Sequence, residues 1–169
     1  MTFTLRPETP DDHAAIRETT RAAFAPMAFA DGDEHELVGA LREAGALTLS
    51  LVAEEAGRVV GHVAFSPAAA ADGSSGWYTL GPVSVTPERQ RAGIGSALIA
   101  TGLDGLATLG ARGCIVLGDP GYYTRFGFEL APELAPAPEY ATHFMVLITG
   151  EGAAPPNGPM RFHPLFGGG

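Results

Sequence analysis

Residues 89–98 of this chain read Arg89-Gln90-Arg91-Ala92-Gly93-Ile94-Gly95-Ser96-Ala97-Leu98. They stand between a strand-like run, Tyr78 to Val85, and a helix-like run, Ile94 to Leu109. Glycines let a backbone approach a ligand closely, and the first N–H groups of a helix have no partner within that helix. A glycine-rich turn that opens a helix is therefore a candidate phosphate-binding site.

Two well-known phosphate loops do not fit this turn. A P-loop carries a lysine directly after its second glycine, and this turn has no lysine. A dinucleotide fingerprint reads Gly-x-Gly-x-x-Gly, and Leu98 stands where its third glycine belongs. The pattern that remains is Gln90-x-x-Gly93-x-Gly95, with Arg89 and Arg91 beside it. Taken alone, this pattern also fits a plain strand-to-helix turn.

The remaining pattern resembles the acyl-CoA loop of the GNAT superfamily of N-acetyltransferases, Gln/Arg-x-x-Gly-x-Gly/Ala. Downstream, the run from Tyr123 to Phe128 resembles the Tyr-x-x-x-Gly-Phe segment of that superfamily. The runs 118–123 and 161–166 also look like a YhbS-like subgroup of predicted bacterial acetyltransferases. The resemblance implies a mixed, mostly antiparallel α/β sheet that splays at a bulged strand and carries helices on both faces.

The predicted elements follow hydrophobic periodicity and turn residues. Helices are expected from Thr9-Pro10 to Phe24 and over 33–43. Strands are expected over 3–6, 49–54, 59–66, 78–85, 114–117 and 143–149, with another near Gly127 and with 49–54 and 59–66 as a hairpin. Loops are expected over 25–32, 68–75 and 131–138, and a short helix opens at Asp119-Pro120. Gly81-Pro82 predicts a bulge, kink or edge, and 160–166 should pack back onto the domain.

Length and composition predict one globular domain over 1–166 with a frayed tail at 167–169, since the chain has 169 residues and is 46% hydrophobic. A net charge of −9 argues against nucleic acid as a partner. No apolar run is long enough for a bilayer, and residues 1–10 lack a signal-peptide pattern, so a cytoplasmic location is expected. The single cysteine, Cys114, is expected to be a small buried side chain.

The resemblance also implies roles for individual residues, with acetyl-CoA as the donor and a primary amine, small molecule or peptide, as the acceptor. Backbone N–H groups of Arg91, Ala92, Gly93, Ile94, Gly95 and Ser96 would surround the pyrophosphate, and Gln90 would also belong to the cofactor-binding loop. The strand Val83-Ser84-Val85 would pair with the pantetheine arm in a cleft beside strand 114–117, and a backbone N–H near Val83 would stabilise the oxyanion. Tyr123 would protonate the departing thiolate, and Phe126 would contact CoA. The alternative for Tyr123 is a packing aromatic.

Several questions stay open at this stage. For a general base, Glu34, His35, Glu36 and His62 are candidates, and each also has an ordinary structural explanation. No His or acid pair shows a convincing metal-ligand spacing, so no metal is expected. A non-catalytic acyl-CoA-binding regulatory module and an enzyme for a longer acyl chain are the competing functions. A homodimer is compatible with the sequence, and the acceptor is not specified.

Overall fold

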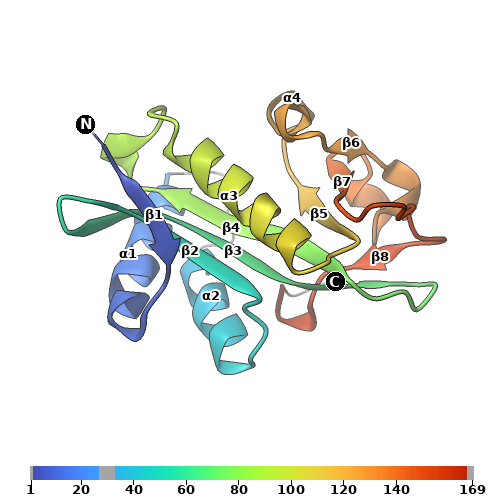
Figure 1. The fold of residues 1–169 in the computed structure, drawn as a ribbon, viewed down its shortest axis with the longest axis horizontal. Coiled ribbons are helices and arrows are strands. Elements are labelled where there is room, and N and C mark those ends of the chain that lie inside the picture. The colour runs from blue at the N-terminus through green and yellow to red at the C-terminus, as the bar shows by residue number, and fades with distance from the viewer. Residues whose placement is uncertain (1, 27–32, 167–169) are drawn as a thin grey trace. The chain divides into compact units, whose positions relative to one another are not determined.

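The computed structural model describes residues 2–26 and 33–166 (Figure 1). Contacts divide the chain into two compact units. The first comprises Met1–Phe65 and Gly81–Gly102, and the second comprises Ser66–Leu80 and Leu103–Gly169. Three elements, β3 (Arg58–Ala70), β4 (Trp77–Val85) and α3 (Ile94–Thr108), run from one unit into the other.

The first unit contains an antiparallel ladder of β1 (Thr4–Pro7), β2 (Leu49–Glu55) and the first part of β3. Val52 pairs with His62 in the β2–β3 register. The two-residue turn between these strands places Ala56 at φ +52° and Gly57 at φ +77°, as a tight hairpin turn requires. The predicted hairpin and the predicted first strand are therefore confirmed.

Two helices cover one face of this ladder. A 3-10 turn at Pro10–Asp12 leads into α1 (His13–Phe24), and α2 spans Glu34–Glu43. Buried Ile16, Val38 and Val52 form the core between the helices and the strands. Both predicted helices are confirmed, although the first opens with 3-10 geometry. Of the predicted loop 25–32, residues 27–32 lie outside the described part of the chain.

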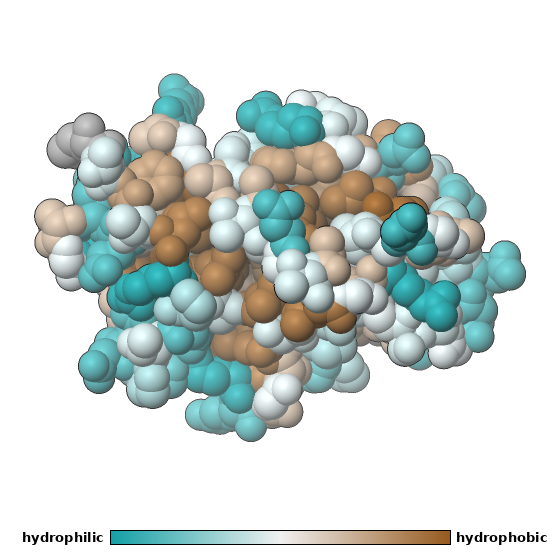
Figure 2. All heavy atoms as spheres, in the orientation of Figure 1, coloured by the Kyte–Doolittle hydropathy of each residue, from teal (hydrophilic) through white to brown (hydrophobic). Residues whose placement is uncertain are grey.

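The first half of α3 covers the opposite face of β3 (Figure 1). A Cβ added at Gly61 would lie 2.9 Å from Ile94 Cγ2 and 3.1 Å from Leu98 Cδ1. The missing side chain therefore lets the start of α3 lie close against β3. The helix has a single charged residue, Asp104, and Figure 2 shows apolar residues gathered in its region of this side of the molecule.

The second unit contains the one parallel pairing found among the described strands. Trp77–Thr79 of β4 pair in parallel with residues 113–115 of β5 (Gly113–Leu117), and β5 pairs antiparallel with β7 (Phe144–Ile148). The edge strand β6 is Glu129–Leu130, and β8 (Met160–Arg161) pairs with the end of β3. The strand order β1-β2-β3-β4-β5-β7-β6 confirms the expected mixed, mostly antiparallel sheet.

The structure differs from the sequence-based prediction at four places in this unit. Ala68–Ala70 belong to β3, because their backbone finds a partner in β8. The pairing also adds a strand, β8, that the sequence did not predict. Gly127 has φ +97° and ends a 3-10 turn, so β6 begins only at Glu129. The expected loop 131–138 contains a 3-10 turn, Pro132–Leu134, and a further 3-10 turn spans Pro138–Tyr140.

The end of the chain packs as expected. Met160 is fully buried with Trp77, Ile115 and Phe144, and Phe162 packs against the same core. The irregularity expected at Gly81-Pro82 agrees with the end of the β4–β5 pairing, because the parallel ladder stops at Thr79, two residues before Gly81. Beyond that point β4 continues to Val85.

Candidate functional site

The first candidate part of the site is the turn between β4 and α3, in the first unit. Gln90 to Gly93 are exposed, whereas Ile94 is buried and anchors the helix start. Arg91 has φ +67° and Gly93 has φ +84°. A left-handed arginine is uncommon, and such residues occur where a turn must aim backbone N–H groups. The turn therefore has the backbone geometry of an anion-binding loop.

The opening of α3 adds further donors. Near the start of the helix, Ala97 N–H donates to the Gly93 carbonyl at 3.0 Å. The N–H groups of Ile94 and Gly95 consequently find no backbone partner among the described residues. Their partial positive charge and the helix dipole favour an anion at this end. No metal is needed for that interaction.

Three contacts of the first unit hold this turn in place. The Arg89 guanidinium donates two hydrogen bonds to the Glu55 carboxylate, at 2.9 and 2.8 Å. Thr86 N–H donates to the Val60 carbonyl at 2.9 Å. Gln90 Nε2 donates to the Val85 carbonyl at 3.1 Å. The Arg89 and Gln90 side chains therefore stabilise the turn through hydrogen bonds to other parts of the protein, whereas the Arg91 side chain is exposed.

The strand that precedes the turn presents alternating sides. Val83 and Val85 are half-buried, and Ser84 is only 3% exposed. Ser84 Oγ lies 3.3 Å from Thr20 Oγ1 of α1. The Ser84 side chain thus faces α1, and only its backbone is available for the strand-like pairing expected from the sequence.

The second candidate part is an aromatic cluster of the second unit. Asp119 caps α4 (Pro120–Tyr123) by accepting a hydrogen bond from Gly121 N–H at 2.9 Å. The Tyr123 ring packs edge-on against Tyr122 and Phe128, with centroid distances of 5.0 and 5.8 Å. A Cβ at residue 118 would lie 2.4 Å from this ring, so Gly118 is required for its position.

The Tyr123 hydroxyl is a protonated group at neutral pH. Burial, followed by the neighbouring Tyr122 and Cys114, raises the pKa of Tyr123 to about 12. A phenol in this state can donate a proton but does not serve as a base. Phe126 is half-buried at 6.2 Å from the Tyr123 ring, and Tyr122 carries the Arg125 guanidinium 4.2 Å over its face.

Cys114 is fully buried, as expected, and burial raises the pKa of its thiol well above the ordinary range. A buried neutral thiol is a poor nucleophile. Within 2–26 and 33–166, no group of three His, Cys, Asp or Glu side chains is arranged to hold a metal ion. No helix in those ranges is both long and apolar enough to cross a membrane.

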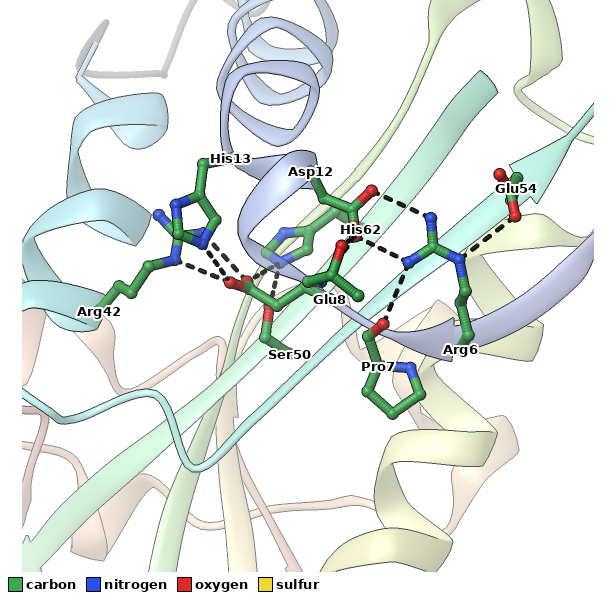
Figure 3. A network of polar contacts seen from close by, with 10 residues as sticks. Arg6, Pro7, Glu8, Asp12, His13, Arg42, Ser50, Glu54 and His62 are labelled. Carbon is green, nitrogen blue, oxygen red and sulfur yellow. Dashed lines mark hydrogen bonds and ion pairs between the residues drawn. The ribbon is translucent and has the colours of Figure 1, made fainter. Parts of the chain in front are cut away.

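A polar network of the first unit had no counterpart in the sequence analysis (Figure 3). The Glu8 carboxylate accepts two hydrogen bonds from Arg42, at 2.8 and 3.0 Å, and a third from Ser50 Oγ, and it lies 3.1 Å from His13 Nε2. Burial alone would raise the pKa of Glu8, but Arg42 and Ser50 outweigh it and the pKa is lowered.

His62 joins this network from β3. Its Nε2 lies 2.7 Å from Ser50 Oγ, and its side chain is fully buried. Burial is the main reason why the pKa of His62 falls to about 4. Its Nδ1 has no hydrogen-bond partner among the described residues. The imidazole is therefore neutral at pH 7, with one nitrogen unused.

The other candidates for a base lie at the start of α2. Glu36 is 63% exposed, 3.8 Å from Arg17 and 4.0 Å from His35. Glu34 and His35 are half-buried, and all three remain candidates for the base.

A cavity of about 570 Å³ lies in the first unit, between α1, the β2–β3 hairpin and residues 86–88. Five acidic side chains line it, against two arginines: Asp11, Asp12, Glu18, Glu54 and Glu88, with Arg6 and Arg58. Arg6 itself is bound to Asp12 and Glu54. This lining is unsuited to the phosphates of a nucleotide, so the cavity does not compete with the turn as their site.

The family follows from comparison with known proteins. A model of the acetyltransferase (GNAT) domain matches residues 47–130. The uncharacterized N-acetyltransferase YhbS of Escherichia coli K12 is 40% identical over 128 residues, 75% of this chain and 74% of that protein. The chain belongs to the GNAT acetyltransferases. The resemblance drawn from Gln90, Gly93, Gly95 and Tyr123, including the YhbS-like subgroup, is thereby confirmed.

Solved structures agree with this assignment. A GNAT family acetyltransferase from Brucella melitensis, in complex with acetyl-CoA, is 49% identical, with a TM-score of 0.86 over 98% of this chain and 99% of that one. YhbS from Escherichia coli, in complex with CoA, aligns with a TM-score of 0.88 and 34% identity over 97% and 91% of the two chains. This GNAT acetyltransferase therefore has relatives that bind acetyl-CoA or CoA, and the non-catalytic alternative is not favoured.

Proposed function

We propose that this acetyltransferase transfers the acetyl group of acetyl-CoA to a primary amine by direct attack on the thioester. One observation carries the proposal above all. The turn has left-handed Arg91 and Gly93, and the N–H groups of Ile94 and Gly95 have no backbone partner among the described residues, in a chain similar to an acetyltransferase that binds acetyl-CoA. We assign the turn to the pyrophosphate.

The chemistry follows from the groups on hand. The amine nitrogen attacks the carbonyl carbon, and a backbone N–H of β4, at Val83, stabilises the oxyanion. The tetrahedral intermediate then loses the C–S bond, and the thiolate takes the Tyr123 hydroxyl proton. The attacking nitrogen releases its proton to water, and the Tyr123 phenolate regains a proton from water before the next turnover. Cys114 takes no part, because its thiol is neutral and buried.

Both units are assigned to one acetyltransferase domain over residues 1–166. The turn and Val83 belong to the first unit, while Tyr123 and Phe126 belong to the second. Three continuous elements, β3, β4 and α3, connect the units, which supports a shared function. We further propose that acetyl is preferred over longer acyl chains, as the acetyl-CoA complex of the Brucella relative suggests.

Calorimetry and rate measurements test this proposal in two steps. Titration with acetyl-CoA should show saturable binding, and the lack of binding at millimolar donor would refute the function. Tyr123→Phe should lower turnover on an amine panel and leave donor affinity unchanged. Tyr122→Phe is the matched control, because it removes a neighbouring hydroxyl and should keep turnover. Equal rates for both variants would remove Tyr123 from the acid role.

A further inference from the structure

The buried hydroxyl groups of Thr20 and Ser84, where α1 meets β4, have their protons committed. Thr20 Oγ1 donates to the Ile16 carbonyl at 2.8 Å. The proton in its 3.3 Å contact with Ser84 must therefore come from Ser84 Oγ. Ser84 has no second proton, so its remaining lone pair can only accept.

The protons in the hydrogen bonds around His62 can be assigned in the same way. The ionised Glu8 carboxylate can only accept, so its contact with Ser50 uses the Ser50 proton. Ser50 Oγ must then accept from His62 Nε2–H in their 2.7 Å contact. The neutral imidazole consequently carries its proton on Nε2 and presents a bare lone pair on Nδ1. Glu8, which follows β1, and Ser50 of β2 together fix this tautomer (Figure 3).

His62 and Ser84 are neighbours across the two strands. The bond from Thr86 N–H to the Val60 carbonyl sets an antiparallel register, in which Ser84 lies opposite His62 two residues further on. Directly opposite residues have Cβ atoms about 4.5–5.5 Å apart. His62 shares the face of its partner Val52, and Ser84 faces α1, so both side chains lie on the same side.

Two acceptors thus lie side by side in a buried place, with 0% and 3% exposure, and Nδ1 is unpartnered. A buried acceptor without a donor is costly, and a group with two hydrogens satisfies both. Water and a neutral primary amine both have that chemistry. An amine held by its two hydrogens would keep its nitrogen lone pair free for attack.

We propose that His62 Nδ1 and Ser84 Oγ form a two-acceptor site for an NH2 or H2O group, with the acceptor amine as its occupant during acetyl transfer. Ser50 and Glu8 are positioning residues that hold the tautomer. The identity of the occupant in turnover rests on the proposed function, whereas the tautomer and the unpartnered Nδ1 do not. Ser84 directly follows Val83, which we assigned to the thioester oxyanion.

Nitrogen NMR of the full chain labelled with 15N-histidine tests the site without any acetyl transfer. Of the five histidines, His62 is identified by its loss in His62→Gln. At pH 7 we expect protonated Nε2 and unprotonated Nδ1. Ser50→Ala should shift His62 towards a mixture of tautomers. Ser66→Ala, which deletes another buried serine hydroxyl on β3, should leave the His62 signals unchanged. A proton on Nδ1 in the native chain overturns the proposal.

Two arms distinguish the occupants. Methylamine should move the Nδ1 resonance saturably, and trimethylamine, with at most one N–H, should not. A water signal at Nδ1 that methylamine does not displace would overturn the assignment of the amine as occupant. If neither methylamine nor water gives a signal at Nδ1, the site itself is overturned. In acetyl transfer, Ser84→Ala should raise KM for the amine at least fivefold and leave KM for acetyl-CoA unchanged. If the proposed function is wrong, the native protein transfers no acetyl group, but His62 still shows the expected tautomer.

Discussion

Gly93 is the residue at which the loop can be tested with the smallest change. Its φ of +84° lies in the left-handed region, and a Cβ there would meet no atom within 4 Å. Gly93→Ala therefore adds backbone strain and no steric clash. The loop from Gln90 to Gly93 is exposed, and the only hydrogen bond of Gly93 within the described residues is at its carbonyl, from Ala97.

The strain should consequently appear in binding and not in folding. A left-handed conformation costs an L-residue about 1–2 kcal/mol. In the free protein the exposed loop can relax and avoid most of this cost. Acetyl-CoA needs the original conformation to receive the N–H groups, so the cost reduces its affinity. One to two kcal/mol corresponds to a weakening of Kd by about 5- to 30-fold.

Gly110→Ala is the matched control at the other end of α3. Gly110 has φ +81° and equally open space, but Ala111 N–H bonds to the Leu106 carbonyl at 3.1 Å and Gly110 N–H to Ala107 at 3.0 Å. These bonds fix its conformation, so this variant should lose about 1–2 kcal/mol of unfolding free energy and keep its affinity. Calorimetry and urea unfolding measure both quantities. A Gly93→Ala affinity within twofold of the native value would show that the left-handed conformation of this residue does not control acetyl-CoA binding.

Three further predictions concern a support of the turn, the buried thiol and the pH dependence of stability. Arg89→Ala breaks the pair with Glu55 and should weaken acetyl-CoA binding about two- to fivefold, as a loss of 0.5–1 kcal/mol implies. Arg58→Ala on the same hairpin should leave the affinity unchanged, and equal losses of affinity in both variants would contradict the role of Arg89. Cys114→Ala should keep acetyl transfer while costing about 1 kcal/mol of stability, and a complete loss of transfer in the rate assay would point to a covalent intermediate. The pKa of His62 is lowered to about 4 in the fold, so the unfolded chain takes up a proton first as the pH falls below 6.5. Stability should drop by about 2 kcal/mol between pH 7 and pH 5. His62→Gln should remove most of that drop in urea unfolding, and an unchanged drop would show that other groups cause it.

The sequence was sufficient wherever a pattern is local. The hairpin turn at Ala56-Gly57, the helix start at Thr9-Pro10 and the cap at Asp119 all follow from residues close together in the chain, and the structure confirms each. The turn at 90–96 is also a local feature, because its glycines and the following helix lie within one short segment, and its role in binding the donor stays a prediction.

Long-range pairing explains what the sequence did not reveal. Ala68–Ala70 became part of β3 only because residues 160–161 pair with them, about ninety residues later. The Glu8–Ser50–His62 network joins three segments that carry no common motif. The sequence shows only that Glu8 follows a strand and that His62 lies within another strand. Neither position shows that the two side chains are close in the fold. The role of Gly61 likewise depends on Ile94 and Leu98, which no local pattern reveals.

Amide chemical-shift mapping during a titration with acetyl-CoA shows whether the turn between β4 and α3 holds the pyrophosphate of the donor. We expect saturable shifts, largest in the first unit at the N–H groups of Arg91, Gly93, Ile94 and Gly95. Binding that leaves these signals unmoved, or no binding at millimolar acetyl-CoA, would contradict this role of the turn.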